Sequence, residues 1–125
     1  MGYKSGLVGK YQIKKEGKTL ETLEISDAND NKGEMSGTLT VDVDGKTYKL
    51  AVNGHYHWFK SEGPPTSIAF WAQKSDAPSS VYEAWAGTTI LNDFKTLDMK
   101  GVRSIIDPDK VEPLKNLNGP FVRQE

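Results

Sequence analysis

Apolar and polar residues alternate along most of this 125-residue chain, in short runs that are separated by turn residues. No apolar run keeps the 3.6-residue period of a core helix for long enough to predict one. Alternation with a period of two predicts β-strands, because successive side chains point to opposite faces of a strand. The strands predicted in this way cover about residues 7–13, 19–25, 35–43, 46–58, 66–72, 81–89, 94–104 and 121–123.

The third and fourth predicted strands show the alternation most clearly. One face of the third strand carries Met35, Gly37, Leu39, Val41 and Val43. Asp44-Gly45 then predicts a type I′ hairpin turn, because both turn positions need a positive φ that Asp and Gly tolerate. One face of the fourth strand carries Tyr48, Leu50 and Val52 and continues through Gly54, Tyr56 and Trp58. These two faces are expected to line the core.

Tight turns make each predicted strand the neighbour of the one before it. About eight such strands indicate an antiparallel up-and-down β-barrel or a sandwich, and the barrel is favoured because closure removes exposed strand edges. The segment after residue 105 is less regular. Asp107-Pro108 predicts an N-cap and a first helical turn, and Pro113 would end that helix after about residue 112. Residues 1–125 are predicted to form a single β-barrel domain.

The charge and the cysteine content of the chain exclude several classes of function. The net charge of −1 gives no general attraction to nucleic acid or to anionic lipid. Without cysteine, the chain has no disulfide and no thiolate nucleophile or metal ligand. No apolar run approaches the roughly 20 residues needed to cross a membrane, and the first residues do not read as a secretory leader. We therefore expect no nucleic-acid or membrane partner, and the compartment, cytoplasmic or secreted, is left open.

Aromatic residues gather in the middle strands, where residues 66–72 and 81–89 each contain a tryptophan. Alternation prevents Phe70 and Trp71 from both pointing inward, and the same holds for Trp58 and Phe59. Some rings must therefore lie on the outer surface, where they commonly pack against another subunit or stack on a sugar ring. A homodimer or homotetramer is one expectation from this pattern, and a glycan ligand is another.

Two carboxylates interrupt apolar strands. Glu83 stands between Tyr82 and Ala84, and Asp98 stands between Leu97 and Met99. Alternation favours an outward position for both side chains on half-buried strands. An inward carboxylate would need a partner and would have a shifted pKa, as binding and acid–base residues often do.

The pair His55 and His57, with Glu62 five residues later, resembles the first metal motif of cupins. Residues two apart on a strand share a face, so both imidazoles could reach one ion. The chain contains only these two histidines, so the last histidine of the cupin set is missing. Both also lie opposite in phase to Tyr48 and Leu50, which predicts two exposed histidines. No nucleophile elbow and no phosphate-binding glycine loop is present. No cofactor is expected.

Four short motifs resemble the avidin and streptavidin family. They are Gly9-Lys-Tyr11, Gly33-Glu-Met-Ser-Gly37-Thr-Leu, Thr66-Ser-Ile-Ala-Phe-Trp-Ala72 and Glu83-Ala-Trp85-Ala-Gly87. The resemblance covers about residues 6–104. It implies an eight-stranded up-and-down barrel with a ligand pocket at one open end, often assembled into dimers or tetramers.

The departures from that family concern the ligand. Ile13 and Lys18 stand where the family has Asn and Ser, and the tryptophan of its seventh strand is absent. The ureido group of biotin needs many polar partners, since each unpaired buried polar group costs about 1–3 kcal/mol. We therefore expect a non-enzymatic small-ligand-binding barrel that does not bind biotin tightly. Its expected ligand-binding residues are Tyr11, Trp71, Tyr82 and Trp85. The alternatives are a carbohydrate- or protein-binding module and a metal-dependent enzyme built on His55, His57 and Glu62.

Overall fold

The computed structural model describes residues 6–29, 31–60, 63–76, 79–89, 95–108 and 110–124. In these ranges the regular elements are all strands. Their bounds are β1 Gly9–Lys15, β2 Lys18–Asn29, β3 Glu34–Val43, β4 Lys46–Lys60, β5 Gly63–Asp76, β6 Ser79–Thr89, β7 Thr96–Asp107, β8 Lys110–Asn118 and β9 Phe121–Arg123. Within the described chain, no helix of the length and apolarity needed to cross a membrane occurs.

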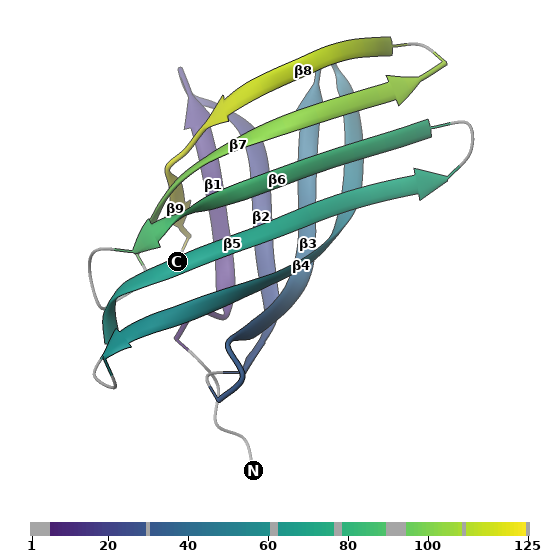
Figure 1. Cartoon of the computed structure of the whole chain (residues 1–125). Coiled ribbons are helices and arrows are strands. Elements are labelled where there is room, and N and C mark those ends of the chain that lie inside the picture. The colour runs from purple at the N-terminus through teal and green to yellow at the C-terminus, as the bar shows by residue number, and fades with distance from the viewer. Residues whose placement is uncertain are drawn as a thin grey trace.

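The strands form one antiparallel sheet that closes on itself (Figure 1). Each strand from β1 to β7 pairs with the next, and the three-residue β9 joins β7 to β1. The result is a closed eight-stranded barrel with β8 as an extra strand. The predicted up-and-down β-barrel is therefore confirmed.

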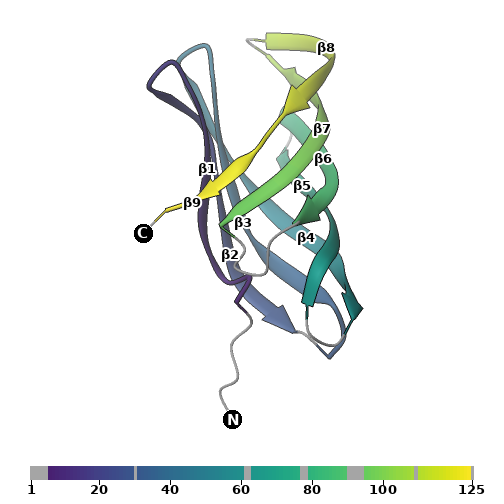
Figure 2. The same ribbon diagram turned by 90° about the vertical axis from the view of Figure 1, so that its left-hand side faces the viewer.

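The wall of the barrel is incomplete beside β8. This strand pairs with β7 along residues 100–107, whereas the register of β1 with β9 covers only Tyr11 and Gln12. Figure 2 shows β8 leaning away from β1 above the short β9. Unpaired edges of β1 and β8 therefore face each other across an opening in the wall.

The predicted helix over about residues 107–112 is wrong. Asp107 ends β7 and pairs with Lys110, so this segment is a tight β7–β8 hairpin. The Asp107 carboxylate does not cap a helix but accepts hydrogen bonds inside the barrel from Lys46, Tyr48 and Ser79, at 2.8, 3.2 and 3.2 Å. Pro113 is tolerated because β8 is an edge strand with an irregular register opposite Ser104.

The turns and the inward faces follow the sequence pattern. Asp44 and Gly45 have φ angles of 50° and 84°, as the predicted type I′ turn requires. Glu16 and Gly17, with φ angles of 53° and 80°, form a similar two-residue loop between β1 and β2. The predicted apolar faces of β3 and β4 are inward, as far as their side chains are described. Their most buried members are Met35, Leu39, Val41, Val43, Tyr48, Leu50, Val52 and Tyr56.

A layer of three rings crosses the middle of the barrel. Trp85 lies edge-on to Phe121, with ring centroids 4.8 Å apart, and stacks on Phe70 at 6.3 Å. Two inward glycines make room for these rings. A Cβ on Gly101 would come within 2.6 Å of the Trp85 ring, and one on Gly54 within 2.6 Å of the Phe70 Cβ. The layer separates the two ends of the barrel.

The two ends are closed to different degrees. At one end, which we call the plugged end, Leu7 is fully buried ahead of β1. Arg123 holds this segment by donating hydrogen bonds to the carbonyl oxygens of Gly6 and Val8, at 2.7 and 2.6 Å. At the other end, which we call the hairpin end, lie the β1–β2, β3–β4, β5–β6 and β7–β8 connections (Figure 1).

Candidate functional site

The four aromatic residues predicted to share a pocket do not meet in one place. Tyr11 and Trp85 are inside the barrel, at 0 % and 2 % exposed, but Trp71 and Tyr82 are outside it, at 47 % and 42 %. The reason is alternation along the strands. Phe70 takes the inward position beside Trp71, and the inward position beside Tyr82 belongs to a carboxylate, Glu83.

Tyr11 belongs to the plugged end. Its hydroxyl donates to the Leu7 carbonyl oxygen at 2.7 Å and accepts from Arg123 Nη1 at 3.0 Å. Burial raises the pKa of Tyr11 to about 12, although the charge of Arg123 acts in the opposite direction. The side chain is therefore a neutral, fully bonded part of the core and fastens the segment that plugs the barrel.

Trp85 lies at the boundary between the aromatic layer and the hairpin end. Its indole faces the interior. The Nε1 atom donates a hydrogen bond to Glu83 Oε1 at 2.7 Å. The ring thus closes the apolar half of the barrel while its polar edge points toward a charged group in the other half.

The predicted outward position of Glu83 is wrong. Its side chain is inside the barrel and only 2 % of the residue is exposed, because Val81, Glu83 and Trp85 share the inward phase of β6. Arg103 is its neighbour across the β6–β7 pair and is also inside, at 5 % exposed. Asp98, by contrast, is exposed as predicted.

Arg103 stands among three carboxylates from three strands. Its Nη1 atom lies 3.7 Å from Glu21 Oε2 on β2 and 3.5 Å from Glu83 Oε2 on β6. Its Nε atom donates to Glu112 Oε1 on β8 at 3.1 Å. One guanidinium therefore serves three acids, which leaves an excess of negative charge unless protons are retained.

The protonation of the two buried glutamates follows from this excess. Burial, the charge of Glu83 and a hydrogen bond with Glu83 raise the pKa of Glu21 to about 10, while Arg103 opposes the shift. Burial also raises the pKa of Glu83, but hydrogen bonds from Glu21 and Trp85 and the charge of Arg103 favour its anion. At neutral pH Glu21 therefore holds a proton and donates it toward Glu83.

A cavity of about 950 Å³ reaches this group from the hairpin end. Glu21, Trp85 and Arg103 form its inner wall. One side of the cavity is the end of β1, residues 13–15, and the other side is the end of β8, residues 115–118. These are the two strand edges that face each other across the opening in the wall. The volume lies within the range of about 300–1,000 Å³ that is usual for small-molecule sites.

Two oxygen atoms of this group accept no hydrogen bond from the described N–H and hydroxyl donors. They are Glu21 Oε1 and Glu83 Oε2, and both are buried. Leaving a buried polar atom unpaired costs about 1–3 kcal/mol, so such atoms are uncommon in interiors whose only role is packing. Of the two residues, Glu21 lines the cavity and offers its acceptor to an incoming group.

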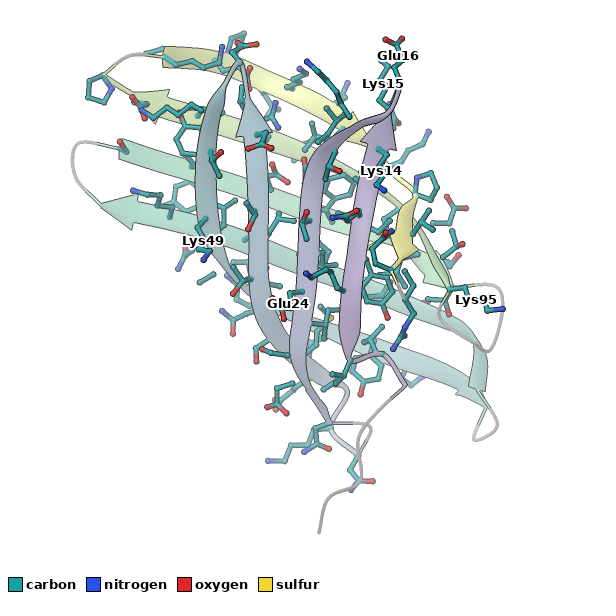
Figure 3. All side chains as sticks on the ribbon, turned by 180° about the vertical axis from the view of Figure 1, so that it is seen from behind. Lys14, Lys15, Glu16, Glu24, Lys49 and Lys95 are labelled. Carbon is teal, nitrogen blue, oxygen red and sulfur yellow. The ribbon has the colours of Figure 1, made fainter. Side chains whose placement is uncertain are left out.

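Charged side chains surround the mouth of the cavity. Lys14 and Lys15 stand at the end of β1, beside the β1–β2 hairpin (Figure 3). Lys18 and Lys115 line the same mouth. Opposite them, Asp44 is paired with Lys110 at 2.6 Å, and this ion pair lowers the pKa of Asp44. The cavity thus runs from an acid-rich inner wall to a lysine-rich mouth.

The histidine motif does not form a metal site in the described part of the chain. His55 and His57 are exposed on the outer face of β4, as their phase predicted. Glu62 lies outside the described residues. Among the residues that are described, no three His, Asp or Glu side chains are grouped so that they could hold a metal ion.

Sequence reasoning missed three members of the group, Glu21, Arg103 and Glu112. Alternation along the strands could have revealed the first two. Glu21 lies two and four residues before the core residues Leu23 and Ile25, and Arg103 lies two residues before Ile105, so each shares the inward face of its strand. No family model, curated protein or solved structure matches this chain. The resemblance to avidins therefore stays a prediction.

Proposed function

We propose that this protein is a non-enzymatic small-ligand-binding β-barrel whose ligand occupies the cavity at the hairpin end. The observation that carries the proposal is a cavity of about 950 Å³ with an indole, a guanidinium and the incompletely bonded carboxyl group of Glu21 at its inner wall. A few polar groups at the base of a concave site fix the orientation of a ligand, while an aromatic surface supplies contact area. Of the four aromatic residues predicted from the sequence, Trp85 lines this cavity.

The spacing of the carboxyl groups favours binding over hydrolysis. Pairs of carboxyl groups that cleave glycosidic bonds stand about 5–9.5 Å apart, because the scissile bond or a water lies between them. Glu21 and Glu83 instead share a hydrogen bond. No room remains between them for a reacting bond, and their arrangement is that of a recognition group.

The polar groups of the cavity also argue against tight binding of biotin. A ureido group needs both donors and acceptors around it, whereas the inner wall offers the carboxyl group of Glu21 and a guanidinium that is already shared among three acids. Ile13, which stands where the avidin family has Asn, lines the same cavity and supplies no polar atom.

A small-molecule screen tests the proposal when paired with two matched variants. Lys115→Trp places a large ring in the mouth of the cavity, whereas Lys49→Trp makes the same change on the outer face of β4 (Figure 3). Ligands found by thermal shift and ligand-observed NMR should lose at least tenfold in affinity with Lys115→Trp and keep it with Lys49→Trp. Ligands that bind both variants alike, or a screen without ligands, would contradict the proposal.

A second candidate function uses the outside of the barrel. Trp71 and Tyr82 stand on the outer faces of β5 and β6, with Ala69, Ala84 and Ala86 exposed around them. Exposed rings beside small residues suit stacking on a sugar or contact with a protein, including a second copy of this chain.

A double variant, Trp71→Ala with Tyr82→Ala, tests this second candidate. We expect it to abolish any signal on a glycan array, or to convert a dimer or tetramer to a monomer in light scattering, without affecting ligands of the cavity. A wild-type protein that is monomeric and silent on the array would rule the outer face out as a binding surface of either kind.

A further inference from the structure

Around the inner wall of the cavity, acidic side chains outnumber basic ones. Glu21, Glu83 and Glu112 all lie within 3.7 Å of Arg103, and Lys110 reaches Glu112 only at 3.9 Å while it holds Asp44 at 2.6 Å. The other strands beside Glu21 offer no compensation, because its partners on β1 and β3 are Ile13 and Val41. The proton on Glu21 therefore occupies the place of a missing cation.

One oxygen atom of Glu21 shows what that cation needs to contact. Glu21 is 4 % exposed and lines the cavity, and its Oε1 atom accepts no hydrogen bond from the described N–H and hydroxyl donors. Glu83 Oε2 accepts none either, but it forms an ion pair with Arg103 at 3.5 Å and does not line the cavity. An ammonium group is a cation with three donors, one of which suits the free Oε1 atom of Glu21. Glu21 would reach it by turning its carboxyl group toward the cavity that it already lines.

The mouth of the cavity has the opposite preference. Lys14, Lys15, Lys18 and Lys115 line it, and these four ammonium groups favour an anion at the solvent end of a bound molecule. We propose that the cavity binds a small zwitterion that places an ammonium group at Glu21 and an acidic group at these lysines. This inference rests on the proposed function and names the chemistry of its ligand.

Binding of the ammonium group displaces the proton of Glu21. The free site holds Glu21 as a neutral acid, and the occupied site holds its carboxylate against the ligand cation. One proton therefore leaves for solvent for each ligand bound, and no covalent bond of the ligand changes. Between pH 6 and 8 the ligand keeps its charge, since amines of this kind titrate near pH 10. Its association constant should then rise about tenfold for each pH unit.

Isothermal titration calorimetry with a set of linear probes tests the charge pattern. We expect 4-aminobutanoate, 6-aminohexanoate or 8-aminooctanoate to bind, with the best chain length matching the span from Glu21 to the lysines. Hexylamine should bind at least tenfold more weakly than the matching amino acid, and hexanoate should not bind. Repeating the titration in two buffers of different ionisation enthalpy should show about one proton released at pH 7.

Two variants that each replace a glutamate of β2 by glutamine distinguish an effect of the site from an effect of the overall charge. Glu21→Gln removes the displaceable proton, so the dependence of affinity on pH should vanish. Glu24→Gln makes the same change on the exposed face of β2 (Figure 3) and should leave it intact. Proton release is measured on the wild-type protein, so the test does not depend on the folding of either variant.

The outcomes separate this inference from the proposed function. Binding of an amino acid with proton release supports both. The cavity could instead bind other molecules, which Lys115→Trp excludes, and none of the zwitterions. In that case the proposed function stands, and the inference that the ligand is a zwitterion is wrong. Binding of a zwitterion without proton release would also overturn the inference, since the cation would not have replaced the proton. If no molecule binds in the cavity, both fail.

Discussion

The two ends of the barrel are built from the same strands but solve the problem of buried polar groups in opposite ways. At the plugged end, the Tyr11 hydroxyl both donates and accepts, and Arg123 is satisfied by carbonyl oxygens and by that hydroxyl. At the hairpin end, three carboxylates share one guanidinium, and Glu21 and Glu83 each keep an unpartnered oxygen.

This difference separates the end that stabilises the barrel from the end where we propose that a ligand binds. A fully bonded interior lowers the free energy of the folded state, whereas retained protons and unpaired acceptors raise it. Proteins tolerate such groups chiefly where binding or chemistry requires them. The plugged end and the aromatic layer therefore stabilise the barrel, and the costly polar group of the hairpin end supports our proposal of a ligand site there.

The largest effect is expected where the two halves meet. Trp85→Ala should lower the free energy of unfolding by about 3–5 kcal/mol, because it removes a buried ring that contacts Phe70 and Phe121. Urea denaturation followed by circular dichroism measures it. A loss below about 1 kcal/mol would mean that the indole lines open space and that the aromatic layer does not hold the barrel.

Arg103→Met tests the charge balance of the hairpin end. Removing the guanidinium takes the ion-pair partner from Glu83 and leaves Glu112 with Lys110 alone at 3.9 Å, and breaking a buried ion pair in this way costs about 3–5 kcal/mol. The loss should be smaller at pH 5 than at pH 8, because the glutamates are more easily protonated at low pH. Denaturation at both values checks this. An equal loss at both would contradict an excess of acid around Arg103.

Tyr11→Phe tests the plugged end with the loss of one oxygen atom. The change should cost about 1–2 kcal/mol, because it leaves the Leu7 carbonyl oxygen without this donor and Arg123 without this acceptor. The cost should not vary between pH 5 and 9, since the pKa of Tyr11 is raised to about 12. A variant as stable as the wild type would show that the Tyr11 hydroxyl does not fasten the plug.

Sequence reasoning recovered the architecture because most of it is local. Two-residue turns such as Asp44-Gly45 and the alternation in β3 and β4 are visible in the chain, and they fix which strands are neighbours and which faces are inward. The 107–112 segment was mistaken for a helix because the partners of Asp107, among them Lys46 and Tyr48, come from a strand about 60 residues earlier.

The site was recovered only in part, for a related reason. Trp85 was chosen through the resemblance to avidins and is inside the barrel, but Trp71 and Tyr82 are outside because their neighbours occupy the inward positions. Alternation on a half-buried strand predicted an outward Glu83. The partners that make its inward position possible, Arg103 and Glu21, come from other strands. Residue type and local alternation do not predict the position of a charged side chain whose partners come from distant strands.

The most direct test of the account is the stability of Glu21→Gln as a function of pH. The folded state holds the Glu21 proton with a pKa of about 10, whereas the unfolded chain releases it near the ordinary glutamate pKa of 4.5. The contribution of Glu21 to the free energy of unfolding is therefore fully present below pH 4.5. As the pH rises from 4.5 toward 10, the free energy of unfolding falls by about 1.4 kcal/mol per pH unit. Glutamine stays neutral in both states and avoids this loss.

Denaturation of the wild type, Glu21→Gln and the exposed control Glu24→Gln between pH 5 and 9 measures the effect. The account predicts that Glu21→Gln is at least as stable as the wild type at pH 5, that its advantage grows by about 1.4 kcal/mol per pH unit, and that Glu24→Gln follows the wild type. A Glu21→Gln variant that is less stable than the wild type by the same amount at every pH would contradict it, because Glu21 would then be an ionised partner of Arg103.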